Sequence, residues 1–241
     1  MAGYFIEARI MGSMKHEIRN ITYDVRKNCY LRGSKPIPHI SIVSNPTPFN
    51  PRRDEKKLLR DFTSICSHYP IMELQFDGFG SFPCSNSNGV AKINIKPSHE
   101  LLELRWDLIS RLKSYCQLDR IFDTKKDYYS PHITIAMNLN QGQLNRVMSY
   151  LRKKEQPHNR HYLTRVTLLK NHKILAEYDF FLKRTLTRNE ALSRRIEAET
   201  NARIRNHLSK KIEEKSINQY KQSIDNPLKA LIIKIKKLIK Y

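Results

Sequence analysis

The segment KPIPHISIV, residues 35–43, contains a pentapeptide that returns in YSPHITIAM, residues 129–137. Both copies read Pro-His-Ile-(Ser or Thr)-Ile. Proline begins each copy, and the first residue of a strand does not have to donate a ladder hydrogen bond. Polar and apolar residues then alternate, which is typical of a strand with one buried face. The repeat therefore predicts two equivalent strands that lie far apart in the sequence.

Each predicted strand presents a histidine and a hydroxyl residue on the same face. In a strand, residues i and i+2 point the same way, and this spacing pairs His39 with Ser41 and His132 with Thr134. The isoleucines between them point to the other face, where helices can bury them. Two matching copies favour one shared functional site over two ordinary buried strands.

The sequence around the two copies indicates alternating strands and helices. Strands are predicted over residues 4–10, 39–43, 71–82, 89–96, 132–137, 162–171 and 173–184, and helices over residues 12–28, 55–68, 99–115 and 143–154. In chain order these elements form two α+β halves of similar plan, each with one copy of the pentapeptide. We therefore expect an α+β fold with two pseudo-symmetric sheet-and-helix lobes, whose motifs meet across a central groove.

The composition changes beyond the last predicted strand. Residues 184–223 show no strand pattern and are predicted to form a long polar helix. A break at Asp225–Pro227 precedes a final helical segment with one apolar face and one lysine-rich face. We expect a catalytic domain at 1–183 and a basic helical extension at 184–241. The final helix fits docking on the protein's own body, on another chain or on an anionic membrane surface.

Charge is the most informative bulk property of the 241-residue chain. The formal net charge is +21 and the isoelectric point is about 9.9. Such a charge attracts polyanions, with nucleic acid first and an anionic membrane surface second. No apolar run reaches the 18 or so residues of a membrane span, and the N-terminus does not have the pattern of a signal peptide. The four cysteines form no Cys-x-x-Cys pair, so we expect reduced thiols in a cytoplasmic protein.

Two imidazoles that face each other can act as an acid–base pair. With ordinary pKa values near the working pH, one can be neutral while the other is protonated. The neutral one removes a proton from an attacking hydroxyl or water, and the protonated one donates to the leaving oxygen. Ser41 and Thr134 can hydrogen-bond the non-bridging oxygens of a phosphate between them. No metal or other cofactor is required, and we expect none.

Two residues beside the motifs are candidate substrate contacts. Tyr129 precedes the second motif, where its ring could stack on a base. Lys35 precedes the first motif and could meet a substrate phosphate. Plain packing of the tyrosine and a solvated lysine are the alternatives.

On these residues the chain resembles the 2H phosphoesterase superfamily, whose signature is two His-x-(Ser/Thr)-apolar motifs. The motifs here are HISI at 39–42 and HITI at 132–135. The branch that the chain resembles most is the 2′-5′ RNA ligase and cyclic phosphodiesterase family. The resemblance covers roughly 1–183, including GFGSFP between the motifs, and Ser41 stands where threonine is commoner.

The resemblance implies a bilobal α+β fold and action on 2′,3′-cyclic phosphates or 2′-5′ linkages of RNA or nucleotides. It further implies a 2′-phosphate product, with His39 as base and His132 as acid. RNA ends, 2′-5′ oligonucleotides and small cyclic nucleotides all stay open as substrates, as does the direction, ligation or hydrolysis. A different class of function is an RNA-binding module that binds phosphate without catalysing a reaction. Such a module would have the same basic charge.

Overall fold

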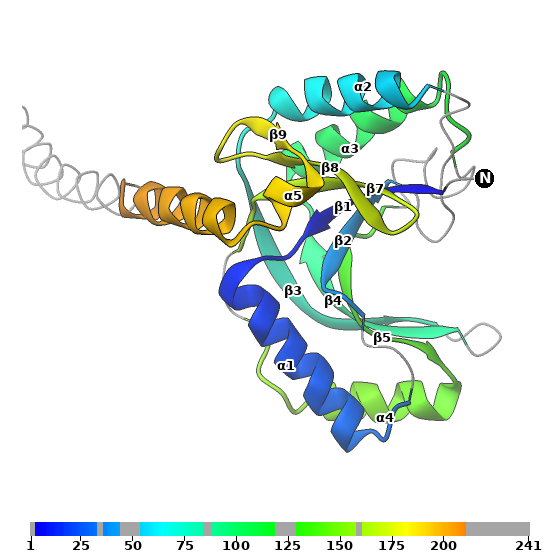
Figure 1. Ribbon diagram of the computed structural model, residues 1–241. Coiled ribbons are helices and arrows are strands. Elements are labelled where there is room, and N and C mark those ends of the chain that lie inside the picture. The colour runs from blue at the N-terminus through cyan, green and yellow to red at the C-terminus, as the bar shows by residue number, and fades with distance from the viewer. Residues whose placement is uncertain are drawn as a thin grey trace, which may run out of the picture. The chain divides into compact units, whose positions relative to one another are not determined.

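The computed structural model describes residues 3–32, 36–43, 54–83, 88–118, 129–157 and 161–210. The chain forms two compact units, Met1–Ile196 and Glu197–Tyr241. The first unit contains both motifs and all the strands of the described residues (Figure 1). The predicted final helix, with the break before it, lies outside the described residues.

The described part of the first unit is an α+β fold. Its strands are β1 (Tyr4–Arg9), β2 (His39–Val43), β3 (Met72–Phe82), β4 (Gly89–Lys96), β5 (His132–Leu139), β6 (His161–Leu163), β7 (Arg165–Lys170), β8 (Lys173–Asp179) and β9 (Arg184–Leu186). Its helices are α1 (Gly12–Asn28), α2 (Glu55–Ser67), α3 (His99–Leu112), α4 (Gln141–Leu151) and α5 (Arg188–Ala191). The strands and helices predicted from the sequence are confirmed with small shifts at their ends, apart from two strands. The strand expected at 162–171 is divided into β6 and β7, and the strand expected at 173–184 ends at Asp179 and is followed by a turn.

The described strands join in one sheet with the order β6-β3-β4-β5-β2-β1-β7-β8-β9, and neighbours are antiparallel. Its middle is narrow, because β2 and β5 pair only through Ile40 and Ile133. This junction separates two lobes. Strands β3, β4 and β5 belong to one, and β2, β1, β7, β8 and β9 to the other. The two motif strands are therefore neighbours at the junction of the lobes.

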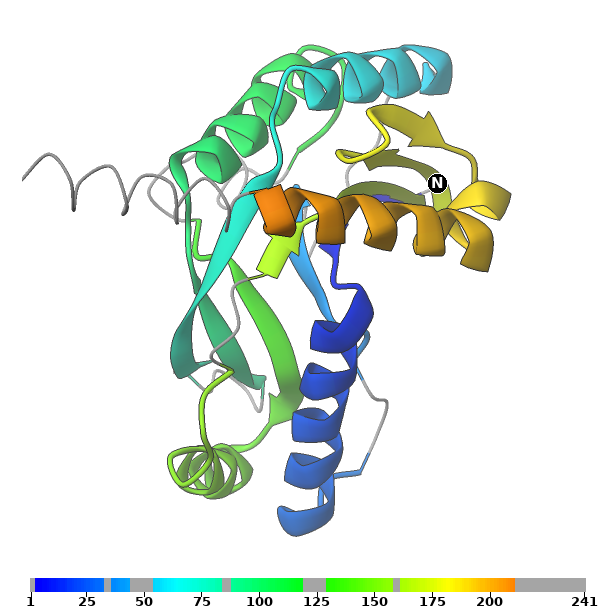
Figure 2. The same cartoon turned by 90° about the vertical axis from the view of Figure 1, so that its left-hand side faces the viewer.

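Each lobe combines one helix that precedes β4 in the chain with one helix that follows it. Helices α1 and α4 pack together and against the lobe of β3, β4 and β5, while α2 and α3 pack together and against β2, β8 and β9 (Figures 1 and 2). The bilobal arrangement predicted from the sequence is confirmed. The lobes, however, are not the two halves of the chain, because α1 packs on β5 and α3 packs on β2.

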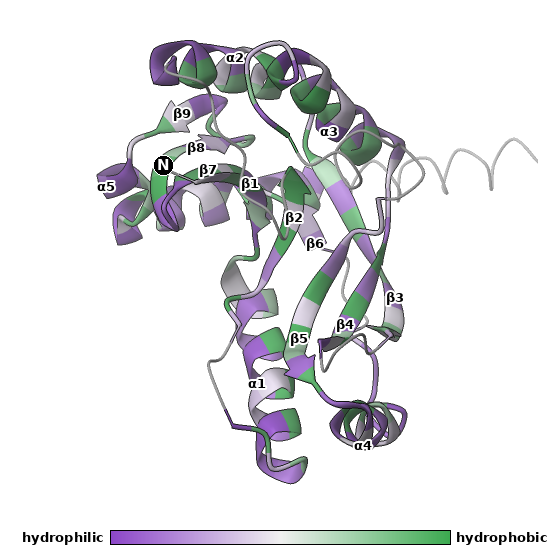
Figure 3. Cartoon of the chain, turned by 90° about the vertical axis from the view of Figure 1, so that its right-hand side faces the viewer, coloured by the Kyte–Doolittle hydropathy of each residue, from purple (hydrophilic) through white to green (hydrophobic). Residues whose placement is uncertain are grey.

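Local sequence explains where the helices begin and which side they bury. The Asp54 carboxylate accepts a hydrogen bond from the Lys57 backbone nitrogen at 2.7 Å, which caps α2. Its apolar side then recurs at helical spacing, and Leu58 and Phe62 are fully buried. Asn140 and Gln143 form a capping box at the start of α4. Figure 3 shows the resulting hydrophobic and hydrophilic stripes on the helices.

The region beyond residue 183 was only partly predicted. Residues 194–210 are helical, as expected, but 184–186 form β9, which pairs with β8. The prediction of a helix there is wrong, because Leu186 is fully buried in a small cluster with Ala191 and Ile196. Tertiary packing therefore outweighs the polar composition. No helix among the described residues is long and apolar enough to cross a membrane.

Candidate active site

The two motif strands bury and expose the residues that the alternation predicts. Ile40 and Ile133 are fully buried in the core, and the following isoleucines are equally covered. The opposite side of the strands, here called the motif face, carries four half-buried polar residues: His39, Ser41, His132 and Thr134. The structure thus brings both copies of the motif to the same part of the sheet.

Both histidines are held in the same orientation. Nδ1 of His39 donates a hydrogen bond to the carbonyl oxygen of Ile37 at 2.7 Å. Nδ1 of His132 donates to the carbonyl oxygen of Ser130 at 2.8 Å. A carbonyl oxygen only accepts, so Nδ1 carries the proton in the neutral ring. Nε2 is then left in each ring to accept or donate a proton in a reaction.

The two imidazoles are close enough to influence each other. Burial is the largest cause that lowers the pKa of His132 below its ordinary value, and the charges of Lys92 and His39 lower it further. The hydrogen bond with Ser130 acts in the opposite direction. Burial therefore favours the neutral form of His132, as does any positive charge on its partner histidine.

Tyr129 links the two motif segments. Its hydroxyl donates a hydrogen bond to the backbone carbonyl of Ser41 at 3.0 Å, and the Arg105 guanidinium lies 4.4 Å from the centre of its ring. Burial raises the pKa of its hydroxyl, which keeps it a donor. These contacts fix β2 against the segment that leads into β5. Stacking of Tyr129 on a base stays a prediction, and Lys35 lies outside the described residues.

Two residues on strands next to the motifs were missed by the sequence analysis. Glu7 of β1 pairs with Ser41 of β2, and Lys92 of β4 pairs with Thr134 of β5. Directly paired residues point to the same face, so both belong to the motif face. Oε2 of Glu7 lies 3.9 Å from Nε2 of His39. Only the strand register reveals this neighbourhood.

A third missed residue, Phe82, lies between Lys92 and the second histidine. Nζ of Lys92 is 3.9 Å from the centre of the Phe82 ring and donates a hydrogen bond to Oγ of Ser130 at 3.3 Å. The rings of Phe82 and His132 meet edge to face with centres 4.9 Å apart. Phe82 belongs to the GFGSFP stretch, which the sequence analysis included in the family resemblance. That stretch was the sequence signal by which Phe82 could have been found.

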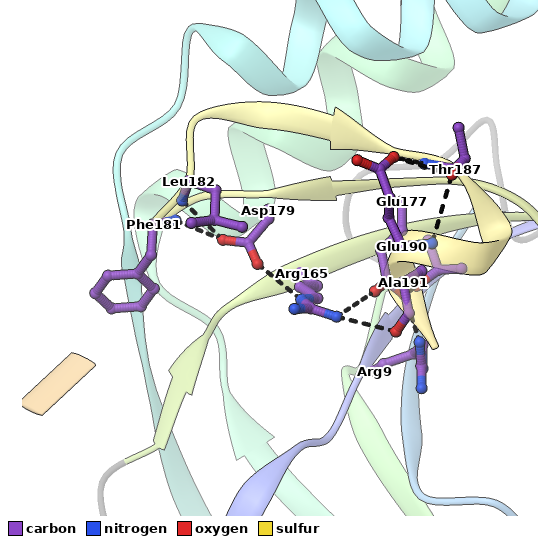
Figure 4. Close-up of polar contacts among 10 residues, drawn as sticks. Arg9, Arg165, Glu177, Asp179, Phe181, Leu182, Thr187, Glu190 and Ala191 are labelled. Atoms are coloured by element: carbon purple, nitrogen blue, oxygen red, sulfur yellow. Dashed lines mark hydrogen bonds and ion pairs between the residues drawn. The ribbon is translucent and has the colours of Figure 1, made fainter. Parts of the chain in front are cut away.

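A buried charge network continues the motif face along β7 and β8 (Figure 4). The fully buried Arg165 binds Glu177 at 3.0 Å and Asp179 at 2.8 Å. Glu177 also accepts hydrogen bonds from Arg9 at 2.8 Å and from the Thr167 hydroxyl at 2.6 Å. We call these five residues the Arg165 network. Each buried charge in the network requires an oppositely charged partner, because an unpaired buried charge would strongly destabilise the fold.

The Arg165 network reaches the turn after β8 and helix α5. Arg165 donates a further hydrogen bond to the carbonyl of Ala191 at 3.2 Å, while Asp179 accepts from the backbone nitrogens of Phe181 and Leu182 at 2.9 Å. The network therefore ties α5 and the turn after β8 to Arg165 of β7. In the described part of the chain, no group of three or more His, Cys, Asp or Glu side chains is placed to hold a metal ion.

Comparisons with known proteins were made for the sequence and for the fold. A family model described as the 2′-5′ RNA ligase superfamily matches residues 13–174. A search of curated proteins gave no match. Solved structures that resemble the chain include E. coli LigT complexed with 3′-AMP, with 13% identity, a TM-score of 0.41 and coverage of 76% of this chain and 91% of that one. Another is E. coli LigT in apo form, with 17% identity, a TM-score of 0.44 and coverage of 70% of this chain and 88% of that one. A third is described as a phosphoesterase, with 16% identity, a TM-score of 0.45 and coverage of 77% of this chain and 92% of that one.

Proposed function

The chain belongs to the 2′-5′ RNA ligase superfamily, and on that premise we propose that it is a phosphoesterase that opens 2′,3′-cyclic phosphates on RNA ends or nucleotides. One observation carries the proposal. His39 and His132 lie on neighbouring strands, and each ring is oriented by an equivalent hydrogen bond from Nδ1 to a carbonyl. This leaves two Nε2 atoms for one reaction.

The arrangement supports hydrolysis by paired acid and base. One imidazole accepts a proton from water while the water oxygen bonds to phosphorus. The bond between phosphorus and one ribose oxygen breaks, and the other imidazole gives its proton to that oxygen. The hydroxyls of Ser41 and Thr134 hydrogen-bond the non-bridging oxygens, where charge accumulates in the transition state. No step requires a metal ion.

The same groups serve ligation when a 5′-hydroxyl replaces water. The base then removes the proton of that hydroxyl, and the product is a 2′-5′ phosphodiester when the 3′ oxygen leaves. The direction depends on which acceptor occupies the site. A polynucleotide substrate suits the net charge of +21. Residues 194–210 add exposed bases to that attraction, namely Arg194, Arg195, Arg203, Arg205 and Lys210.

The test is incubation of an RNA that ends in a 2′,3′-cyclic phosphate with the wild-type protein in EDTA, followed by mapping of the product end. Replacing His39 or His132 by Ala should lower turnover by about 10²–10⁴-fold. The double variant should be little worse than either single variant, because both groups serve one transition state. His99→Ala is the matched control, since its side chain is 79% exposed on α3.

Two outcomes would contradict the proposal. Loss of activity in EDTA that a divalent ion restores would show that the reaction depends on a metal. Normal turnover in both histidine variants, with reduced RNA affinity alone, would show that the motif face binds RNA without catalysing the reaction.

A further inference from the structure

Helix α1 has a buried side and an exposed side of opposite character. Its buried residues recur at helical spacing. Its exposed side carries Arg19, Tyr23 and Lys27, which are four residues apart and therefore lie along one side of the helix. Tyr30 follows just beyond the end of α1. We call these four residues the α1 outer face, along which positive charges and aromatic rings alternate.

The two tyrosines of the α1 outer face bury little of their rings. Tyr23 is 54% exposed and Tyr30 is 81% exposed. Tyr30 also has a φ of 54°, which is a left-handed conformation that bulky side chains rarely adopt. The fold gains little from a ring that is both strained and exposed, so contact with a ligand explains it better than packing does.

The segment that follows α4 adds positive charge beside α1. Helices α1 and α4 pack together, and α4 is followed directly by Arg152, Lys153 and Lys154, which are exposed. Nζ of Lys154 lies 3.1 Å from Oδ2 of Asp24, which is an acid of α1. This contact neutralises the carboxylate, so Asp24 opposes the positive charge of the α1 outer face less.

Positive charge is concentrated on the helices of this lobe. Helices α1 and α4 together contain five basic and two acidic residues, and the three bases after α4 add to this excess. Helices α2 and α3 of the other lobe contain five basic and five acidic residues. The basic character of α1 and α4 is therefore not a general property of the helices, and it attracts a polyanion to this lobe.

Single-stranded RNA is the polyanion that best fits the α1 outer face. Its phosphates pair with basic side chains, and its unpaired nucleobases stack on exposed aromatic rings. A duplex covers the faces of its nucleobases and offers no such stacking. An anionic membrane would require an apolar face of the helix to be available for insertion, whereas the apolar residues of α1 pack in the core.

We propose that the α1 outer face, together with Arg152, Lys153 and Lys154, binds single-stranded RNA at a place separate from the motif face. Helix α1 packs against β5, whose isoleucines are buried in the core. The helix therefore lies on the side of the sheet opposite to the motif face. This binding does not depend on the reaction proposed for the two histidines.

The test is fluorescence anisotropy of a labelled single-stranded RNA that ends in a 3′-hydroxyl, titrated with the full chain at several salt concentrations. Arg19→Gln combined with Lys27→Gln should weaken binding and reduce the magnitude of the log–log salt slope by about 1.4, because each lost phosphate contact removes about 0.7. Lys56→Gln combined with Arg60→Gln on α2 is the matched control, since both side chains are exposed and the same charge is removed. The control pair should have the smaller effect on affinity.

Replacement of the tyrosines separates stacking from charge. Tyr23→Ala combined with Tyr30→Asn should lower the affinity for the RNA about tenfold and leave the salt slope unchanged, because stacking involves no phosphate. Asparagine is chosen at position 30 because it tolerates the left-handed conformation. Urea unfolding should show no loss of stability in either α1 variant, since all four side chains are exposed.

Three results would overturn the proposal. The first is an α1 charge variant that loses no more affinity than the α2 control pair. The second is a tyrosine variant that binds the RNA as the wild type does. The third is an α1 charge variant that binds RNA normally but loses binding to phosphatidylserine vesicles, which would identify a membrane surface. The measurements need no turnover, so they separate these outcomes from failure of the proposed function.

Discussion

Removal of the buried guanidinium of Arg165 is the sharpest test of the Arg165 network, which continues the motif face along β7 and β8. In the wild type, this group is fully buried and binds Glu177 and Asp179. Arg165→Met keeps an unbranched side chain of similar length but removes the charge. Two carboxylates then stay in a region from which water is excluded.

The contacts that survive set the size of the effect. Removing one partner of a buried ion pair costs about 3–5 kcal/mol of unfolding free energy. Glu177 would still accept hydrogen bonds from Arg9 and Thr167, and Asp179 would still accept two backbone hydrogen bonds. We therefore expect the lower end, about 3 kcal/mol. At about 2–4 °C per kcal/mol for a unit of this size, the midpoint of thermal unfolding should fall by about 6–12 °C.

The assay is urea unfolding monitored by circular dichroism. For each variant, the dependence of the unfolding free energy on urea concentration (the slope) is compared with that of the wild type. Arg184→Met is the matched control, because Arg184 makes a partly exposed pair with Glu190 at 2.7 Å, and its loss should cost at most about 1 kcal/mol. Arg165→Lys should fall between the wild type and Arg165→Met, since it keeps the charge but loses the two-pronged geometry. A loss below about 1 kcal/mol for Arg165→Met, with an unchanged slope, would refute the reasoning.

Three further predictions concern the site, the tail and acid stability. Ser41→Ala and Thr134→Ala should each slow cyclic phosphate hydrolysis through lost contacts to the phosphate oxygens; unchanged kcat in both would exclude that role. Deletion of 197–241 should leave turnover of a small cyclic mononucleotide nearly unchanged but flatten the salt dependence of long-RNA binding, and equal loss on both substrates would contradict it. Burial lowers the pKa of His161 to about 4, so stability should fall as the pH drops from about 6.5 towards that value, where the unfolded state binds the proton more readily. His161→Leu should reduce this loss in urea unfolding at pH 7 and pH 4, and an unchanged loss would show that His161 is not its source.

The sequence predicted what depends on local periodicity. The alternation in HISIV and HITIAM placed the histidines and hydroxyls on one face and the isoleucines in the core, because that pattern needs only neighbouring residues. The capped, amphipathic helices were predicted for the same reason. These features include both motifs and most of the fold.

What the sequence could not predict depends on register and on distant packing. Glu7 and Lys92 read as ordinary polar positions of strands, and only their pairing with Ser41 and Thr134 brings them to the motif face. Strand β9 has three residues, too few for a periodic signal. It forms because Leu186 is buried, so the first unit extends past residue 183, where the sequence placed a boundary. That 1–183 contains the whole catalytic function stays a prediction.

The exchange of helices between the lobes has a consequence for synthesis on the ribosome. When the chain has emerged only as far as the end of β3, α1 lacks β5 and β2 lacks α3. Neither lobe is complete until α4 and then β7 and β8 have left the exit tunnel. Strand pairing of β1 with β7 also joins residues more than 150 positions apart, and such long-range pairing slows folding. Nascent chains that stop before β7 should therefore remain sensitive to proteases and dependent on chaperones.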